Sequence, residues 1–258
     1  MSTPTPPRLT AGNLAKSLAD IDVWVFDLDN TLYPPKSSLF PQIDTRIRDY
    51  IANFLGVLPE EAYRIQKHFF HTYGTSLMGM TREHGAEPRP FLDYVHDIDM
   101  SVIEPDSALC SALEQLPGRK LVFTNADARY ATRVLERIGI GHCFETIFDI
   151  EAAGYLPKPH AATYRRMLAE HGVDPATAVM FDDLPRNLVP AAELGMTTVW
   201  VSNTAEWVTE TGVAPDHTVE HLADWLHTEV LPLAPRPAID TPTAPAMVPR
   251  TPYTQEKP

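Results

Sequence analysis

The chain has 258 residues, 44% of them hydrophobic, which is enough to bury a core in one large domain or two small ones. Its formal net charge of -13 argues against nucleic acid or an anionic membrane as a main partner, because phosphate backbones are bound by clustered Lys and Arg. An anionic ligand would therefore need a local positive pocket, built by a metal ion, a lysine and helix N-termini.

The two ends of the chain are rich in proline. Residues 1–10 lack the apolar run of a signal peptide, and residues 232–258 contain few large apolar side chains, so we expect both to be disordered. No run approaches membrane-spanning length, and we expect a soluble, cytoplasmic protein. Cys110 and Cys143 lie in no metal-ligand spacing, and we interpret them as buried thiols in a reducing compartment.

The first folded element is a short apolar run, 23–26, that ends in Asp27 and Asp29, followed by Asn30 and Thr31. This pattern indicates a strand buried on both faces, with the carboxylates at its C-terminal end, where open α/β sheets bind ligands. Two carboxylates so close repel each other unless a divalent cation lies between them or one stays protonated. The alternative is an ordinary turn, in which Asp and Asn are common.

The next segment, 34–117, has helical rather than strand periodicity. One helix face is marked by Ile43, Ile47, Ile51 and Leu55. Shorter helical patterns follow at 90–97 and 106–116. We interpret most of this segment as a small helical cap, inserted after the first strand, that could close over the strand ends and exclude water. The alternative is a packing domain without a gating role.

A second helix in this segment begins at Pro59 and ends at Tyr73 and Gly74, and a loop is expected to follow. His68 and His71 lie three residues apart on this helix, with His84 nearby, which could suggest a transition-metal site. A hydrated or packed helix face is the better interpretation, because no paired cysteines or HExxH pattern supports metal binding.

Beyond the helical segment, strands alternate with helices. Strands are predicted at 120–125, 146–149, 178–183 and 197–202. Asp127 can cap a helix that stops at Gly139, and Pro159 suits the first position of a helix that stops near Gly172. This alternation predicts parallel βαβ units in a doubly wound α/β sheet.

Polar side chains recur where these strands end. Thr124 and Asn125 close one strand, and Asp182 and Asp183 close another, as the first two aspartates do in the initial strand. Singly, each pair is compatible with a turn or a helix cap. Their recurrence at the same edge of a parallel sheet favours a ligand site there.

A further pair, Lys158 and Pro159, lies between the Thr124–Asn125 motif and the Asp182–Asp183 motif. With these motifs in this order, the chain resembles the haloacid dehalogenase (HAD) superfamily of phosphotransferases. The resemblance covers nearly all of the folded region. It implies a HAD-like core formed by 11–33 and 118–231, with 34–117 as the cap and its return connection.

A narrower resemblance, to the pyrimidine 5'-nucleotidase group, is carried by residues 26–34, 71–75, 123–126 and 181–183. That group hydrolyses nucleoside monophosphates, especially UMP and CMP, with magnesium. A departure is the Leu184–Pro185 pair, where the group commonly carries Ser after the two aspartates.

The resemblance also implies roles for individual residues. Asp27 would attack phosphorus to form an aspartyl phosphate, and Asp29 would act as general acid and base. Thr124, with neighbouring backbone N–H groups, would hold the phosphoryl oxygens, and Lys158 would neutralise their charge. Asn125 is expected to lie beside Thr124 and Lys158 and to bind the substrate with them.

The same resemblance implies a magnesium site and a substrate-binding end of the cap. Asp27, the Asp29 carbonyl and Asp183 would bind Mg²⁺, with Asp182 placed behind them, although the order of the last pair stays open. Tyr73 and Gly74, with the loop to about Met80, would reach the leaving group of a small phosphate ester. The oligomeric state, monomer or homodimer, is left undecided.

Three other functions fit the motifs less well. A phosphatase of another metabolite, such as a sugar phosphate, would share the core, because the cap selects the leaving group. A HAD dehalogenase would lack the second acidic residue, which is present here as Asp29. A phospho-accepting receiver carries its Asp pair on the first strand and its Lys-Pro last, whereas Asp182 and Asp183 follow Lys158 here.

Overall fold

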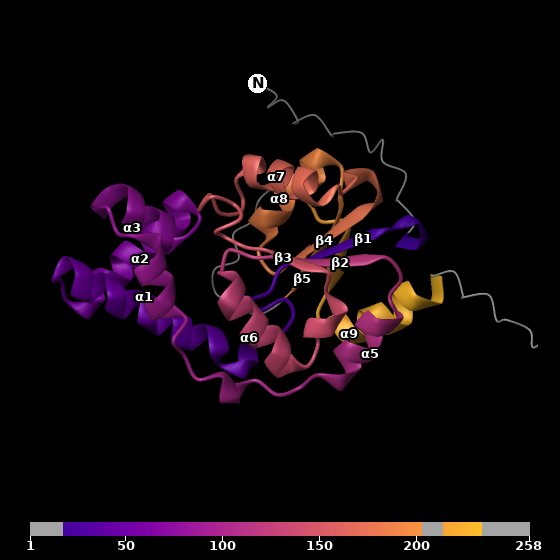
Figure 1. The fold of residues 1–258 in the computed structure, drawn as a ribbon, viewed down its shortest axis with the longest axis horizontal. Coiled ribbons are helices and arrows are strands. Elements are labelled where there is room, and N and C mark those ends of the chain that lie inside the picture. The colour runs from indigo at the N-terminus through magenta and orange to yellow at the C-terminus, as the bar shows by residue number, and fades with distance from the viewer. Residues whose placement is uncertain (1–17, 203–213, 234–258) are drawn as a thin grey trace, which may run out of the picture.

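The computed structural model describes residues 18–202 and 214–233, so the predicted tails, 1–10 and 232–258, lie outside the described part except for residues 232 and 233, which belong to a short helix. The described strands form one parallel sheet in the order β3-β2-β1-β4-β5-β6 (Figure 1). Their bounds are β1 Val23–Phe26, β2 Arg119–Phe123, β3 Thr146–Phe148, β4 Ala178–Asp182, β5 Thr197–Val201 and β6 His217–Val219. The predicted doubly wound α/β fold is confirmed.

The central strand β1 is buried along its whole length. Its side chains alternate between two cores, because successive residues of a strand point to opposite faces. Trp24 and Phe26 belong to one hydrophobic cluster, and Val23 and Val25 belong to the other. The indole of Trp24 donates a 2.7 Å hydrogen bond to the carbonyl of Pro117, which satisfies its polar atom inside the core.

Helices cover both faces of the sheet (Figure 1). One face is covered by α5 (Ser107–Gln115), α6 (Ala128–Ile138) and α9 (Leu222–Trp225), and the other by α7 (Ala161–His171) and α8 (Pro185–Leu194). Asp127 caps α6 by accepting hydrogen bonds from two backbone N–H groups, and Gly139 ends it in a left-handed conformation, as predicted. Within residues 18–202 and 214–233, no helix is both long and apolar enough to cross a membrane.

The segment between β1 and β2 forms a helical layer beside the sheet (Figure 1). It contains α1 (Leu39–Leu55), α2 (Pro59–Tyr73), α3 (Ser76–His84) and α4 (Pro88–Val95). These helices share a third hydrophobic cluster that includes Ile51, Phe69, Met80 and Phe91. The close packing of α2 on α3 depends on Gly79, since a Cβ there would lie 2.2 Å from the ring of Phe69.

Three expectations about secondary structure were wrong. The loop expected after Gly74 is helix α3, which Thr75 caps by accepting from the backbone N–H of Met78. Helix α7 begins at Ala161 rather than at Pro159, which follows a cis peptide bond. The strand β6 was missed because its three residues, His-Thr-Val, include one large apolar side chain and so do not form an apolar run.

Candidate active site

A cavity of about 170 Å³ lies where the C-terminal end of β1 meets the helical layer. Its core side is lined by Asp27, Asp29, Asn30, Asn125, Ala126, Asp183, Leu184 and Asn187. Its helical side is lined by Phe40, Ile43, Asp44, Ile47, Gln66, Lys67, Phe70, His71, Thr75, Ser76, Leu77, Phe91, Val95 and His96. Carboxylates therefore face a wall that is largely apolar and aromatic.

Asp27 is buried at the end of β1. Its Oδ1 accepts a 2.8 Å hydrogen bond from Nζ of Lys158, and its Oδ2 accepts from the hydroxyl of Thr31 at 3.2 Å. Burial raises the pKa of Asp27 to about 7; the ammonium of Lys158 opposes this rise, whereas Asp182 and Asp29 add to it. The ionised carboxylate thus depends on nearby positive charge.

Lys158 supplies part of that charge from a fully buried position. Its ammonium also donates to Oδ2 of Asp182 at 2.7 Å and to the carbonyl of Phe123 at 2.9 Å. Burial alone would lower the pKa of Lys158, but the attraction of Asp182 and Asp27 raises it above its ordinary value. The lysine is therefore charged and fixed between two aspartates.

Asn125 fixes the backbone of Lys158. Its Oδ1 accepts from the backbone N–H of Lys158 at 2.8 Å, and its Nδ2 donates to the Lys158 carbonyl at 3.3 Å. The hydroxyl of Thr124, which is buried, accepts from the backbone N–H of Ala126 at 3.0 Å. The end of β2 thus positions the lysine directly, although the two segments lie far apart in the sequence.

The two aspartates at the end of β4 have different surroundings. Asp182 is fully buried; its Oδ1 accepts from Nδ2 of Asn187 and from the backbone N–H of Leu184, both at 2.9 Å, and its Oδ2 is bound to Lys158. Asp183, in contrast, lines the cavity. The sequence left this order open, and of the two side chains Asp183 is the one that lines the cavity.

The carboxylates of Asp27, Asp182 and Asp183 can bring one oxygen each to within 4.8 Å of the others. All three are buried, and Lys158 is the positive side chain bonded among them. Buried like charges this close need further compensation, and oxygen donors are the ligands that Mg²⁺ prefers. The three oxygen donors, which outnumber the one ammonium bonded among them, fit a divalent cation of that kind.

Asp29 is held by two tyrosines that sequence reasoning did not assign to the site. Its Oδ1 accepts from the hydroxyl of Tyr130 at 2.7 Å and also from the hydroxyl of Tyr33. Burial, and then the charge of Asp29, raise the pKa of both phenols well above their ordinary value, so they act as donors. The sequence did not point to Tyr130, because helical periodicity indicates which positions are buried but not which partner a hydroxyl meets.

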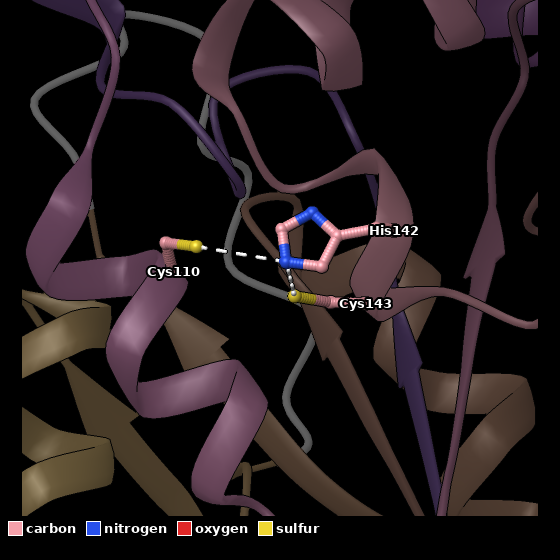
Figure 2. A group of neighbouring side chains, drawn as sticks. All are labelled: Cys110, His142 and Cys143. Carbon is pink, nitrogen blue, oxygen red and sulfur yellow. Dashed lines mark hydrogen bonds between the residues drawn. The ribbon is translucent and has the colours of Figure 1, made fainter.

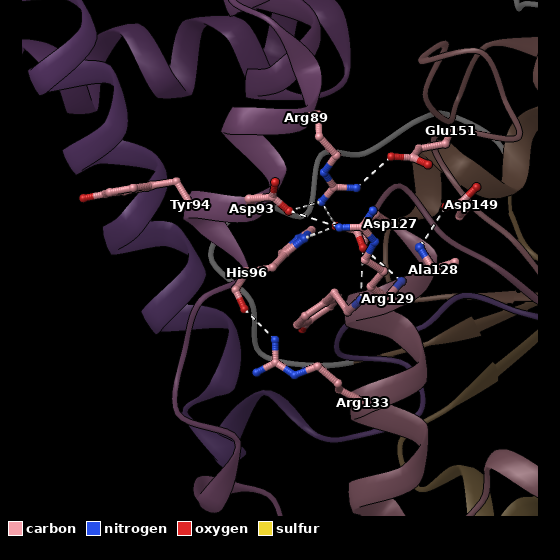
Figure 3. A network of polar contacts seen from close by, with 12 residues as sticks. Arg89, Asp93, Tyr94, His96, Asp127, Ala128, Arg129, Arg133, Asp149 and Glu151 are labelled. Atoms are coloured by element: carbon pink, nitrogen blue, oxygen red, sulfur yellow. Dashed lines mark hydrogen bonds and ion pairs between the residues drawn. The ribbon is translucent and has the colours of Figure 1, made fainter.

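Tyr130 also connects this site to the helical layer through His96, which lies beside Arg89 and Asp127 (Figure 3). The ring of His96 stacks on Tyr130 with centroids 4.3 Å apart, and its Nδ1 lies 2.7 Å from Oδ2 of Asp127. Arg89 of α4 bridges Asp127 at 3.2 Å and Glu151 at 2.7 Å. Burial would raise the pKa of Asp127, but hydrogen bonds and charges from its partners, His96 first, lower it well below its usual range.

The structure does not bring Tyr73 to the cavity. Its hydroxyl instead donates to Glu83 of α3. Gly74 lies behind the site: it has φ of +88°, and a Cβ there would lie 3.0 Å from the carbonyl oxygen of Lys158. Arg186 of α8 reinforces this contact, since its guanidinium donates to the carbonyls of Phe70 and Gly74.

Instead, a polar group on α1 and α2 faces the cavity, and the sequence analysis missed it. Nε2 of Gln66 and Nζ of Lys67 donate to Oδ1 of Asp44 at 2.8 and 3.0 Å. Oε1 of Gln66 is buried and has no hydrogen-bond partner within the described ranges. His71, which had been interpreted as part of a hydrated or packed helix face, also lines the cavity.

Comparisons with known proteins agree with this fold. The family model described as haloacid dehalogenase-like hydrolase matches residues 21–195. The chain is 27% identical over 210 residues to Phosphate metabolism protein 8 of Saccharomyces cerevisiae, covering 74% of this chain and 63% of that protein's length. The chain thus spans less than two thirds of this relative.

Solved structures show the same architecture at low identity. L-2-haloacid dehalogenase from Xanthobacter autotrophicus aligns with a TM-score of 0.54 at 17% identity, covering 80% of this chain and 97% of that one. A HAD phosphatase from Thermococcus onnurineus gives 0.53 at 17%, covering 80% and 96%. A putative HAD-hydrolase from Bacillus subtilis, bound to magnesium, gives 0.53 at 15%, covering 80% and 97%. Since the family model matches most of the chain, the protein belongs to the haloacid dehalogenase-like hydrolase family.

Proposed function

We propose that the protein is a magnesium-dependent phosphomonoester hydrolase that forms an aspartyl phosphate at Asp27 and acts on nucleoside monophosphates, especially those of pyrimidines. The observation that carries the proposal is the pair Asp27 and Asp29, which open onto one cavity in different environments. Asp27 is bound by Lys158, and Asp29 is held by tyrosine hydroxyls. Two carboxylates so arranged can serve as nucleophile and as general acid and base.

In this mechanism, a carboxylate oxygen of Asp27 attacks phosphorus while the bond to the leaving oxygen breaks, and Asp29 gives that oxygen its proton. Asp29 then takes a proton from a water molecule as the water attacks the phosphorus of the aspartyl phosphate. Inorganic phosphate leaves, and the Asp27 carboxylate is regenerated. The ammonium of Lys158 balances the charge on the phosphoryl oxygens throughout, and the hydroxyl of Thr124 holds them by donating a hydrogen bond.

Asp27, Asp183 and the backbone carbonyl of Asp29 would hold Mg²⁺, with Asp182 behind them as the partner of Lys158. When bound, the cation would stabilise negative charge on the phosphoryl group and let Asp27 stay ionised near neutral pH. Asp182 contributes by fixing the ammonium of Lys158, because both of its oxygens already accept hydrogen bonds.

The helical wall of the cavity supports a nucleoside as the leaving group. Phe70 and Phe91 offer aromatic surface, and the buried Oε1 of Gln66 needs a donor such as a base N–H. A sugar phosphate has no planar ring to stack on these aromatic side chains, which makes it a poorer match. The likeness to Phosphate metabolism protein 8 supports a phosphate ester as the substrate class. In this proposal, α1–α4 act as the cap that covers the substrate.

The test is phosphate release from a panel of nucleoside monophosphates and sugar phosphates, with and without Mg²⁺, with 2-haloacids assayed in parallel. We expect magnesium-dependent turnover that is fastest with UMP or CMP, and no halide release. Asp27→Asn should abolish turnover, and Asp29→Asn should lower kcat by about 10²–10⁴-fold. Full turnover by Asp29→Asn, or faster turnover of sugar phosphates than of every nucleotide, would contradict the corresponding part of the proposal.

Gln66→Leu tests the assignment of the base-binding wall. We expect a higher KM for nucleotides and an unchanged rate with p-nitrophenyl phosphate, which has no base to recognise. The matched control is Gln42→Leu, since Gln42 lies on α1 and bonds to the backbone of Asp99, away from the cavity lining.

A further inference from the structure

A second cluster of ligand-type side chains lies far from the aspartates. Cys110 projects from α5, and His142 and Cys143 belong to the short helix η4 (Gly141–Cys143) that precedes β3. Figure 2 shows both sulfur atoms directed at one imidazole. Because β3 begins three residues after Cys143, this cluster lies at the N-terminal edge of the sheet, opposite the edge that carries Asp27.

The distances within the cluster fit tetrahedral coordination. Sγ of Cys143 lies 3.6 Å from Nε2 of His142, and Sγ of Cys110 lies 3.9 Å from the same nitrogen. The three atoms all lie within 4.8 Å of one another. In a tetrahedral zinc site, bonds of about 2.3 Å to sulfur and about 2.0–2.1 Å to nitrogen place those ligands about 3.5 Å apart. An ion could therefore bind between the three atoms with small side-chain adjustments.

Glu114 completes the set of candidate ligands. It lies one turn after Cys110 on α5, and its Oε1 is 2.9 Å from Nε2 of His142. Its side chain is 56% exposed, so it can rotate toward an ion without disturbing the core. Aspartate or glutamate oxygen is an accepted zinc ligand, and this carboxylate lies at the same nitrogen that both sulfur atoms face, where an ion would bind.

We propose that Cys110, His142 and Cys143 bind a zinc ion with Glu114 as the fourth ligand. The ion would tie α5 to the connection before β3 and so act structurally, away from the proposed hydrolytic site. The expectation that these cysteines are buried was wrong, since both are partly exposed; both are free thiols. They lack a metal-ligand spacing in the sequence, and folding brings them together.

A reactive or redox-active thiol is the main rival. The geometry favours a metal site over this rival, because both sulfur atoms and the carboxylate of Glu114 converge on one nitrogen of His142. A bound dication deprotonates a coordinating thiol directly.

The experiment uses the full chain, stripped of metal under reducing conditions and titrated with Co²⁺ and then Zn²⁺ in excess Mg²⁺. We expect one Co²⁺ per chain to produce a thiolate-to-cobalt charge-transfer absorption in the near ultraviolet, and Zn²⁺ to remove it. Oxygen ligands at the aspartates give no such band, so Asp183→Asn should leave it unchanged. This readout does not involve phosphatase activity.

Variants locate the site. Cys110→Ser, Cys143→Ser and His142→Gln should each weaken zinc binding by at least about 100-fold, and Glu114→Gln by about 10-fold. His84→Gln, which changes an exposed histidine elsewhere, is the matched control and should bind as the original chain does. Melting temperatures of the metal-free variants establish that they fold.

Absence of the cobalt–thiolate band, full zinc affinity in Cys110→Ser, or a disulfide between Cys110 and Cys143 in protein purified without reductant would overturn the proposal.

Discussion

The hydroxyl of Tyr130 donates a 2.7 Å hydrogen bond to Oδ1 of Asp29, across 101 positions of sequence. Tyr33 donates to the same oxygen, so the carboxylate of Asp29 has a fixed orientation beyond the C-terminal end of β1. This bond makes Tyr130 a positioning residue for the proposed general acid, whereas its stacking on His96 connects it to the helical layer.

Tyr130→Phe should lower kcat by about tenfold with little change in KM, because a general acid that is free to rotate spends less time in the reactive orientation. The measurement is steady-state kinetics together with the pH dependence of kcat, which should shift because Asp29 loses a donor. Tyr50→Phe, in the packing of α1 against α4, is the control. A purely structural role would lower the melting temperature of Tyr130→Phe but leave the pH profile unmoved.

Lys158→Met should reduce the free energy of unfolding by about 3–5 kcal/mol and abolish turnover, since it leaves Asp27 and Asp182 buried without their ammonium. Urea denaturation measures the first effect. Adding Asp182→Asn to Lys158→Met removes one orphaned charge, and the double variant should regain part of the stability but none of the activity. Equal stability of the single and double variants would show that the two side chains are not coupled.

Mg²⁺ should stabilise the protein more at pH 8 than at pH 5. The folded-state pKa of Asp27, about 7, lies above its unfolded value of 3.8. In metal-free protein, protonation of Asp27 therefore stabilises the fold below about pH 4, and this stabilisation is lost as the pH rises toward 7. A cation that binds the ionised carboxylate competes with that proton and adds stability through its binding. Melting curves with Mg²⁺ or chelator check this, and Asp183→Asn should remove most of the difference.

Asp127→Asn should cost about 1.5–3 kcal/mol of stability at neutral pH, the range for hydrogen bonds to a charged group. Asparagine still caps α6, so the substitution isolates the charge that His96 and Arg89 recognise. The folded-state pKa of Asp127 is lowered, so its contribution is present above the unfolded value near 4 and is lost as the pH falls through the folded value. Urea denaturation should show the two proteins converging in acid; a constant difference would contradict this.

Gly74→Ala should reduce kcat, because the new methyl group would press on the carbonyl of Lys158 and displace its ammonium. Gly56→Ala is a matched control: Gly56 also has positive φ, +66°, but a Cβ there meets nothing within 4 Å. Gly56→Ala should lose about 1 kcal/mol to backbone strain, and Gly74→Ala should lose more, because its φ of +88° with ψ of -33° lies outside the left-handed helical region. Only Gly74→Ala should lose activity. Similar activity in the two would show that the contact with Lys158 is not needed.

The sequence alone predicted the parallel α/β fold, the ends of α6 and the residues at the strand ends. Those features are local: buried strands read as short apolar runs, Asp127 caps a helix through its own neighbouring N–H groups, and Gly139 ends it through its backbone freedom. Parallel strands then bring their C-terminal ends to one edge, so Asp27 and Asp183 could be associated before the structure was known.

What only the tertiary structure decided are the contacts that such local patterns do not contain. Tyr130 and Asp29 belong to separate parts of the chain, as do Cys110 and Cys143, and only the packing of whole elements brings each pair together. Asp182 and Asp183 are adjacent, but one side chain binds Lys158 and the other lines the cavity. Helical and strand periodicity indicate which face of an element is buried. Which side chain of another element lies against that face depends on how the whole elements pack.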